Sequence, residues 1–107
     1  MEEEMSGDDV TARTAADVNG LWDSWFVPGI SDFVRVPNLS QMFDLEFKTN
    51  GLLEKAMKVV DDYIQQLEID GLEKQIFHPE GSNPMIVYRV EPETWTKNIM
   101  VYGHLDK

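Results

Sequence analysis

Apolar residues in the first third of the chain recur at the spacing of an α-helix. The pattern begins after Thr14, which is followed three residues later by Asp17 in the manner of a capping box. Pro28 either kinks this helix or begins a second one, because proline has no amide hydrogen to donate and clashes with the preceding turn. Pro37 ends the element, because the residue before a proline avoids helical angles. The apolar positions behind this prediction are Val18, Leu21, Trp22, Trp25, Phe26, Ile30, Phe33 and Val34.

A second helix is predicted from about residue 52 to residue 67. Its apolar side chains share one stripe, and Glu54 and Lys58 form an i, i+4 pair on another face. Residues 37–51, between the two helical regions, combine Asn, Ser and Gly with large apolar residues, so we expect this connector to pack on the core. The apolar stripe of the second helix consists of Leu53, Ala56, Met57, Val60, Ile64 and Leu67.

After Gly71 the pattern changes from helical to extended. Short strands are predicted over residues 73–78 and 85–90, with turn residues between them. Residues 98–102 (NIMVY) form a nearly continuous apolar run, which is typical of a strand covered on both faces. The expected fold is therefore α/β, with two helices on a short mixed sheet of about three strands.

The composition limits the classes of protein to which the chain can belong. Its 107 residues allow one domain at most, and the absence of cysteine excludes disulfides and thiolate metal sites. A net charge of -11 disfavours binding to nucleic acid and to anionic membranes, because both need lysine and arginine. The acidic composition of residues 1–12 predicts a disordered tail. An acidic first segment and the lack of a long apolar run favour a cytoplasmic protein.

Candidate chemistry lies immediately after the third predicted strand. Gly103 allows a sharp turn, and His104 and Asp106 follow at positions i and i+2, which point the same way in extended backbone. Asp106 could then accept a hydrogen bond from one ring nitrogen of His104 while the other nitrogen binds a metal ion. On spacing alone, a surface turn with a solvated His and Asp is the favoured interpretation, because His-x-Asp occurs by chance in many proteins.

The stretch VYGHLDK resembles the first metal-site motif of the co-catalytic zinc metallopeptidases (peptidase family M-twenty). This family includes cytosolic non-specific dipeptidase, carnosinase, aminoacylase and succinyl-diaminopimelate desuccinylase. The segment FVRVPNLS is similar to the end of the family's first helix and the turn after it. Taken together, these motifs extend the resemblance over roughly residues 20–107.

The resemblance implies a metal-dependent hydrolase that cleaves the amide bond of dipeptides or acylated amino acids. It assigns His104 as a ligand of one of two zinc ions, with manganese as the alternative ion, and Asp106 as the catalytic-site carboxylate hydrogen-bonded behind it. The family's other ligands and its catalytic base lie further along a longer chain that is typically a homodimer. Residues 13–107 are accordingly expected to be part of a catalytic domain that is inactive alone. The alternative is a non-catalytic acidic module that acts through protein contacts.

Several other residues have a simpler interpretation. His78 is expected to be a polar residue at a strand end, and Ser40 to be a turn or helix-cap hydroxyl. Asp61 and Asp62 are expected on a solvated helix face. The aromatic group Trp22, Trp25 and Phe26 fits core packing better than a partner-binding surface, because it shares a stripe with other apolar residues.

Overall fold

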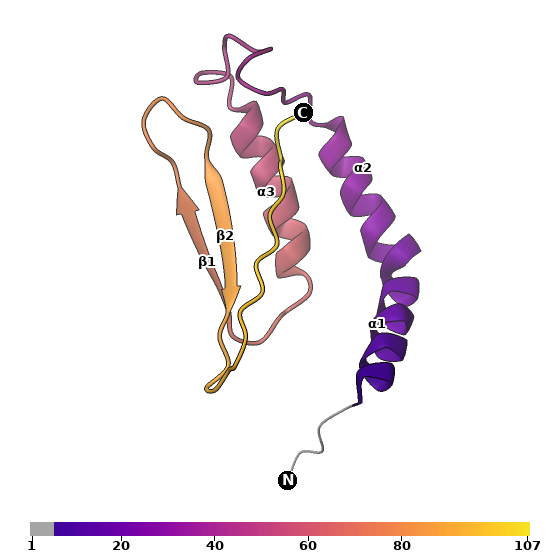
Figure 1. Cartoon of the computed structure of the whole chain (residues 1–107). Coiled ribbons are helices and arrows are strands. Elements are labelled where there is room, and N and C mark those ends of the chain that lie inside the picture. Colours follow the sequence, from indigo (N-terminus) through magenta and orange to yellow (C-terminus); the bar gives the residue numbers. More distant parts are fainter. Residues whose placement is uncertain (1–5) are drawn as a thin grey trace.

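The computed structural model describes residues 6–107. Within these residues, three α-helices and a π-helical turn precede an antiparallel hairpin, so the expected mixed α/β class is confirmed. Figure 1 shows α1 and α2 forming one long rod, with α3 between that rod and the hairpin. The elements are α1 (Gly7–Leu21), η1 (Trp22–Phe26), α2 (Val27–Arg35), α3 (Leu52–Gln65), β1 (Leu72–Phe77) and β2 (Met85–Val90).

The first helix starts earlier than its sequence pattern suggests. Ser6 caps α1 by accepting a hydrogen bond from the amide of Asp9 at 3.2 Å, and acidic residues in the first turn complement the helix dipole. The expected tail over residues 1–12 therefore gives way to helix from Gly7 onward. Thr14 does not cap a helix, because its hydroxyl donates to the carbonyl of Val10 at 2.8 Å. Residues 1–5 lie outside the described part of the chain.

Pro28 lies in the first turn of α2, in agreement with the expectation that it begins a second helix and not with a simple kink. The turn before it is π-helical, which the sequence did not predict. The Val27 amide donates to the carbonyl of Trp22, five residues back. Proline cannot donate to a carbonyl of the preceding turn and its ring crowds that turn, so the wider π turn accommodates it without breaking the rod.

The rod formed by η1 and α2 meets α3 through aromatic side chains. The Trp25 indole donates to the carbonyl of Tyr63 at 3.0 Å, and the Tyr63 hydroxyl donates to Asp32 at 2.6 Å. Gly29 makes room for the Tyr63 ring, because a Cβ at Gly29 would lie 3.0 Å from a ring carbon. Trp25 is thus partly buried against α3, whereas Trp22 is half exposed and stacks on Phe26, so the expected core packing of this aromatic group holds only in part.

The hairpin has the predicted strands in a simple register. Leu72 pairs with Val90 and Phe77 with Met85. The third strand, expected over residues 98–102, does not form: within the described residues the sheet has two strands. The segment is drawn in yellow in Figure 1, where it runs along α3 toward the end of α2. Apolar character favours a strand, but a strand also needs a neighbouring edge to which it can hydrogen-bond.

The centre of the molecule lies where α3 meets the end of α2 and the C-terminal segment. Val36, Leu53 and Ala56 are the buried apolar residues of the described chain, and Asn38 is completely buried beside them. Among residues 6–107, every helix is too short or too polar to cross a lipid bilayer.

Candidate functional site

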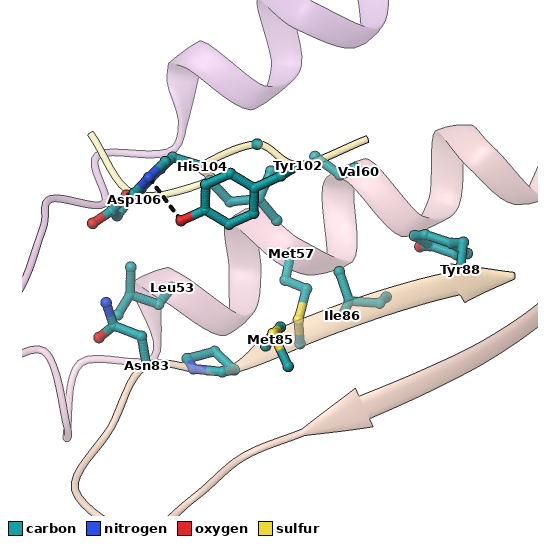
Figure 2. Close-up of a pocket in the computed structure, with 13 residues that line it drawn as sticks. Leu53, Met57, Val60, Asn83, Met85, Ile86, Tyr88, Tyr102, His104 and Asp106 are labelled. Carbon is teal, nitrogen blue, oxygen red and sulfur yellow. Dashed lines mark hydrogen bonds and ion pairs between the residues drawn. The ribbon is translucent and has the colours of Figure 1, made fainter. Parts of the chain in front are cut away.

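His104 and Asp106 are in direct contact. The Nδ1 atom of His104 lies 3.0 Å from a carboxylate oxygen of Asp106, and its Nε2 atom lies 3.0 Å from the hydroxyl of Tyr102. Figure 2 shows the three side chains gathered on one stretch of the C-terminal segment. Extended backbone points residues i and i+2 to the same side, so the sequence spacing places these groups on one side of the segment.

The two hydrogen bonds are consistent with a single imidazole tautomer. Asp106 as a carboxylate can only accept, so Nδ1 of His104 carries the hydrogen that it donates. In the neutral ring Nε2 is then an acceptor, and the Tyr102 hydroxyl donates to it. His104 is largely exposed, whereas the side chain of Asp106 is only 25% exposed. The carboxylate is therefore the better-anchored member of the pair.

Tyr102 also belongs to the site, although its sequence position predicts only a place in a strand. Its ring also meets the His104 ring edge-on, with centroids 5.3 Å apart. The signal was present in the sequence, because Tyr102, His104 and Asp106 alternate at every second residue and so share one side of an extended segment.

The site borders an open cavity of about 490 Å³ between α3, β2 and the C-terminal segment. Apolar side chains such as Leu53, Met57 and Ile86 form one wall, and Tyr102, His104 and Asp106 form part of the other (Figure 2). An apolar cavity with a few polar groups on its wall is the usual form of a small-molecule site.

The backbone around Asp106 is bound to the turn after α2. The buried side chain of Asn38 donates to the carbonyl of Leu105 at 2.7 Å, and the amide of Ser40 donates to the carbonyl of Lys107 at 2.8 Å. The Lys107 ammonium group donates to the carbonyl of Phe33 at 2.7 Å and also to Val36 and Asn38. Burial lowers the pKa of Lys107. The segments PNLS and GHLDK, far apart in sequence, are thus in contact.

These residues fit one ligand position but not a complete metal site. The His104–Asp106 pair has the geometry in which a carboxylate fixes the imidazole that binds an ion. Zinc sites in enzymes use three or more protein ligands. No group of three or more His, Asp or Glu side chains within residues 6–107 could hold a metal ion.

His78 and Ser40 take no part in the contacts of His104. His78 pairs with Glu54 at 3.4 Å beside a separate, smaller cavity, and its side chain is half exposed. Ser40 contributes its backbone to the turn, where its carbonyl accepts hydrogen bonds from the amides of Phe43 and Asp44.

Asp61 is not on a solvated face, contrary to expectation. Its side chain is 17% exposed and accepts hydrogen bonds from Lys74 at 2.8 Å and Tyr88 at 2.5 Å, which join α3 to the hairpin. Burial alone would raise the pKa of Asp61, but hydrogen bonds from Lys74, Tyr88 and Gln65 lower the pKa to about 2. Asp62 is exposed as expected and pairs with Lys58 at 3.0 Å.

No protein-family model matches the chain, and no curated protein matches it significantly.

Proposed function

We propose that this chain supplies one metal-ligand position of a two-metal hydrolase that cleaves the amide bond of dipeptides or acylated amino acids. His104 binds the ion through Nε2, and Asp106 holds the ring through Nδ1. The observation that carries the proposal is the 3.0 Å hydrogen bond between His104 and Asp106. The carbonyl of Leu105, which lies between the two residues in the chain, accepts a hydrogen bond from the buried Asn38. A carboxylate in that position orients the ring and makes the free nitrogen a better ligand.

The residues of the chain have distinct roles in this proposal. Bound metal ions, with zinc as the first choice and manganese as the second, lower the pKa of a water molecule and polarise the scissile carbonyl. The Tyr102 hydroxyl must leave Nε2 of His104 before an ion can bind there, because it occupies the same lone pair. The apolar cavity beside the pair accommodates an apolar part of the substrate.

The proposal includes a larger catalytic domain and a cytoplasmic, homodimeric enzyme. In that domain residues 98–102 pair as the third strand of the sheet, and the missing ligands and catalytic base come from outside the chain. In support of this, the side chains of Ile99, Met100 and Val101 are each 90% or more exposed. Burying such side chains is favourable by about 1.5 to 3 kcal/mol each.

Metal titration of the chain tests the role of His104. We expect zinc to bind with a dissociation constant above about 1 micromolar, because one imidazole is only one of the three or more protein ligands that such sites use. Binding should disappear in His104→Ala and persist in His78→Ala, the matched control with the other histidine of the chain. Isothermal calorimetry measures both. Zinc binding that is indifferent to His104→Ala would contradict the proposal.

An assay of dipeptide hydrolysis in the presence of zinc or manganese tests the expectation that the chain alone is inactive. The chain alone should release free amino acids no faster than metal ions do in buffer, because residues 6–107 place no second carboxylate beside His104 and Asp106 to act as a base. Turnover that is lost in His104→Ala would show that these residues suffice for catalysis and would overturn the expectation of an incomplete site.

A second candidate function is a non-catalytic acidic module that binds other proteins or itself. The same exposed run, Ile99 to Tyr102, favours it, because contiguous exposed apolar side chains commonly mark contact surfaces. If the chain is such a module, its association with a partner or with itself depends on residues 98–102 and is independent of His104. Substitutions within residues 98–102 therefore test the binding module, whereas His104→Ala tests the metal-ligand function.

A further inference from the structure

We propose that Asn38 and Lys107 are positioning residues that set the geometry of the His104–Asp106 pair. The inference deepens the proposed function, since it concerns how the same pair is held. It concerns the hydrogen bond between two side chains of the chain itself, however, and can be tested without a metal ion.

Asn38 acts on the peptide unit between His104 and Asp106. Its side chain is completely buried, and its Nδ2 atom donates to the carbonyl of Leu105 at 2.7 Å. A buried amide has few alternative partners, so this bond fixes the direction of the Leu105 carbonyl. That carbonyl belongs to the peptide that leads into Asp106. Asn38 thus sets the backbone from which the carboxylate projects.

Lys107 holds the other side of Asp106. Its ammonium group donates to the carbonyls of Phe33 and Val36 and to Oδ1 of Asn38, and it lies 4.2 Å from the centre of the Phe33 ring. The end of α2 carries partial negative charge from its free carbonyls, which favours a cation there. The Ser40 amide also donates to the Lys107 carbonyl at 2.8 Å. Asp106 therefore lies between two anchored residues.

The His104–Asp106 pair depends on the contacts of Asn38 and Lys107 because the preceding segment, residues 98–102, is not held by strand pairing. Residues 98–102 form no strand, and His104 is largely exposed. Exposed polar pairs between freely moving side chains are generally marginal. With Leu105 and Lys107 bound to the turn after α2, the Asp106 carboxylate is already placed when the imidazole approaches it. Preorganisation of this kind is what a ligand position requires.

Imidazole ¹⁵N NMR of the metal-free chain, at a pH where His104 is neutral, tests the inference. The wild-type chain should show mainly the Nδ1–H tautomer, because Nδ1 donates to Asp106. Lys107→Met keeps the length of the side chain and removes the charge, and Asn38→Asp keeps the size and removes the donor to Leu105. Both should lose the excess of the Nδ1–H form. Zinc affinity through His104 should fall on the order of tenfold, the lower end of the effect of residues behind a ligand.

Matched controls separate positioning from general stability. Lys48→Met removes an ammonium group that lies 5.8 Å from the Phe47 ring, and Asn19→Asp makes the same amide change on the exposed α1. Neither should alter the His104 tautomer. Lys107 is exposed as a whole residue and only its ammonium group is partly buried, whereas Asn38 is completely buried. Lys107→Met is therefore the deciding variant if circular dichroism shows that Asn38→Asp does not fold.

A folded Lys107→Met chain that retains the wild-type tautomer ratio would overturn the inference and reduce Lys107 to a cap of α2. Lys107→Arg, which keeps the cation, should restore the ratio at least in part. Should zinc prove to bind elsewhere, the proposed function fails, yet the metal-free tautomer ratio still decides the roles of Asn38 and Lys107.

Discussion

Asp61 illustrates how a single carboxylate can join two elements. It lies on α3, and Lys74 of β1 and Tyr88 of β2 both donate to it. Burial first, and then the hydrogen bond with Asp61, raise the pKa of Tyr88, so the phenol keeps its proton and remains a donor. The pKa of Asp61 is in turn lowered to about 2, which means that the folded chain favours the charged carboxylate.

This lowered pKa predicts a specific dependence of stability on acid. A carboxyl group with a lower pKa in the folded than in the unfolded chain stabilises the fold above its unfolded pKa, here near 3.8, and ceases to do so as the pH falls toward 2. Asp61→Asn should therefore lower the free energy of unfolding by about 1 to 2 kcal/mol at neutral pH. The variant should also lose less stability than the wild-type chain between about pH 5 and pH 2, because it lacks the carboxyl group that becomes protonated. Urea unfolding at several pH values measures the free energy.

Asp62→Asn is the control for this prediction. Asp62 is exposed and pairs only with Lys58 among the salt bridges of the described chain, so its substitution should change the free energy of unfolding by less than about 0.5 kcal/mol. Equal effects of the two substitutions would contradict the role given to Asp61.

At the scale of elements, the contact of α2 with α3 depends on a small residue. Gly29 allows the backbone of α2 to lie close to the Tyr63 ring. The Trp25 indole donates to the main-chain carbonyl of Tyr63, and the Tyr63 hydroxyl donates to the Asp32 carboxylate. These contacts join the helical rod to the rest of the molecule and hold the end of α2, where Lys107 binds.

Gly29→Leu should destabilise this junction. The new Cβ would lie 3.0 Å from the Tyr63 ring and the rest of the side chain would displace it, so we expect a loss of about 1 to 3 kcal/mol. Gly20→Leu is the matched control, because a Cβ there meets nothing within 4 Å and the better helix former should add up to about 1 kcal/mol. Thermal unfolding followed at 222 nm distinguishes the two, and stabilisation by Gly29→Leu would refute the packing argument.

For the whole molecule, two opposing features govern association. The chain carries a net charge of -11, which repels copies of itself, while Ile99, Met100, Val101 and Tyr102 expose contiguous apolar side chains. Charge repulsion is screened by salt, whereas burial of apolar surface is not. Association of the chain should therefore become stronger as the salt concentration rises.

Replacing Ile99 and Val101 together by lysine should abolish that association. The two side chains are 91% and 92% exposed, so the substitution removes no packing within the chain. Sedimentation velocity at low and high salt measures the effect. Val10→Lys with Val18→Lys, on the half-exposed α1, is the control that changes the net charge equally. If this control abolishes association as well, the apolar run is not its cause.

Some features of the site follow from local spacing. His104 and Asp106 are two positions apart, and extended backbone points both side chains to the same side of the segment. The contact of Asn38 with Leu105 could not be predicted, because it joins residues 67 positions apart and depends on how the end of α2 meets the C-terminal segment. Asp61 was misplaced for the same reason, since its helical position predicts solvent and only the hairpin supplies its partners.

The sequence by itself predicted, to within one or two residues at each end, the elements that depend on short-range rules: the helix found at Leu52–Gln65 and the strands found at Leu72–Phe77 and Met85–Val90. It also predicted an interruption of the first helical region at Pro28, as either a kink or a new helix. Periodicity and proline chemistry act within a few residues and can be read directly. Only the tertiary structure decided that residues 98–102 remain unpaired and that Lys107 binds the end of α2. Strand pairing and long-range hydrogen bonds depend on which surfaces meet, and no local pattern specifies that.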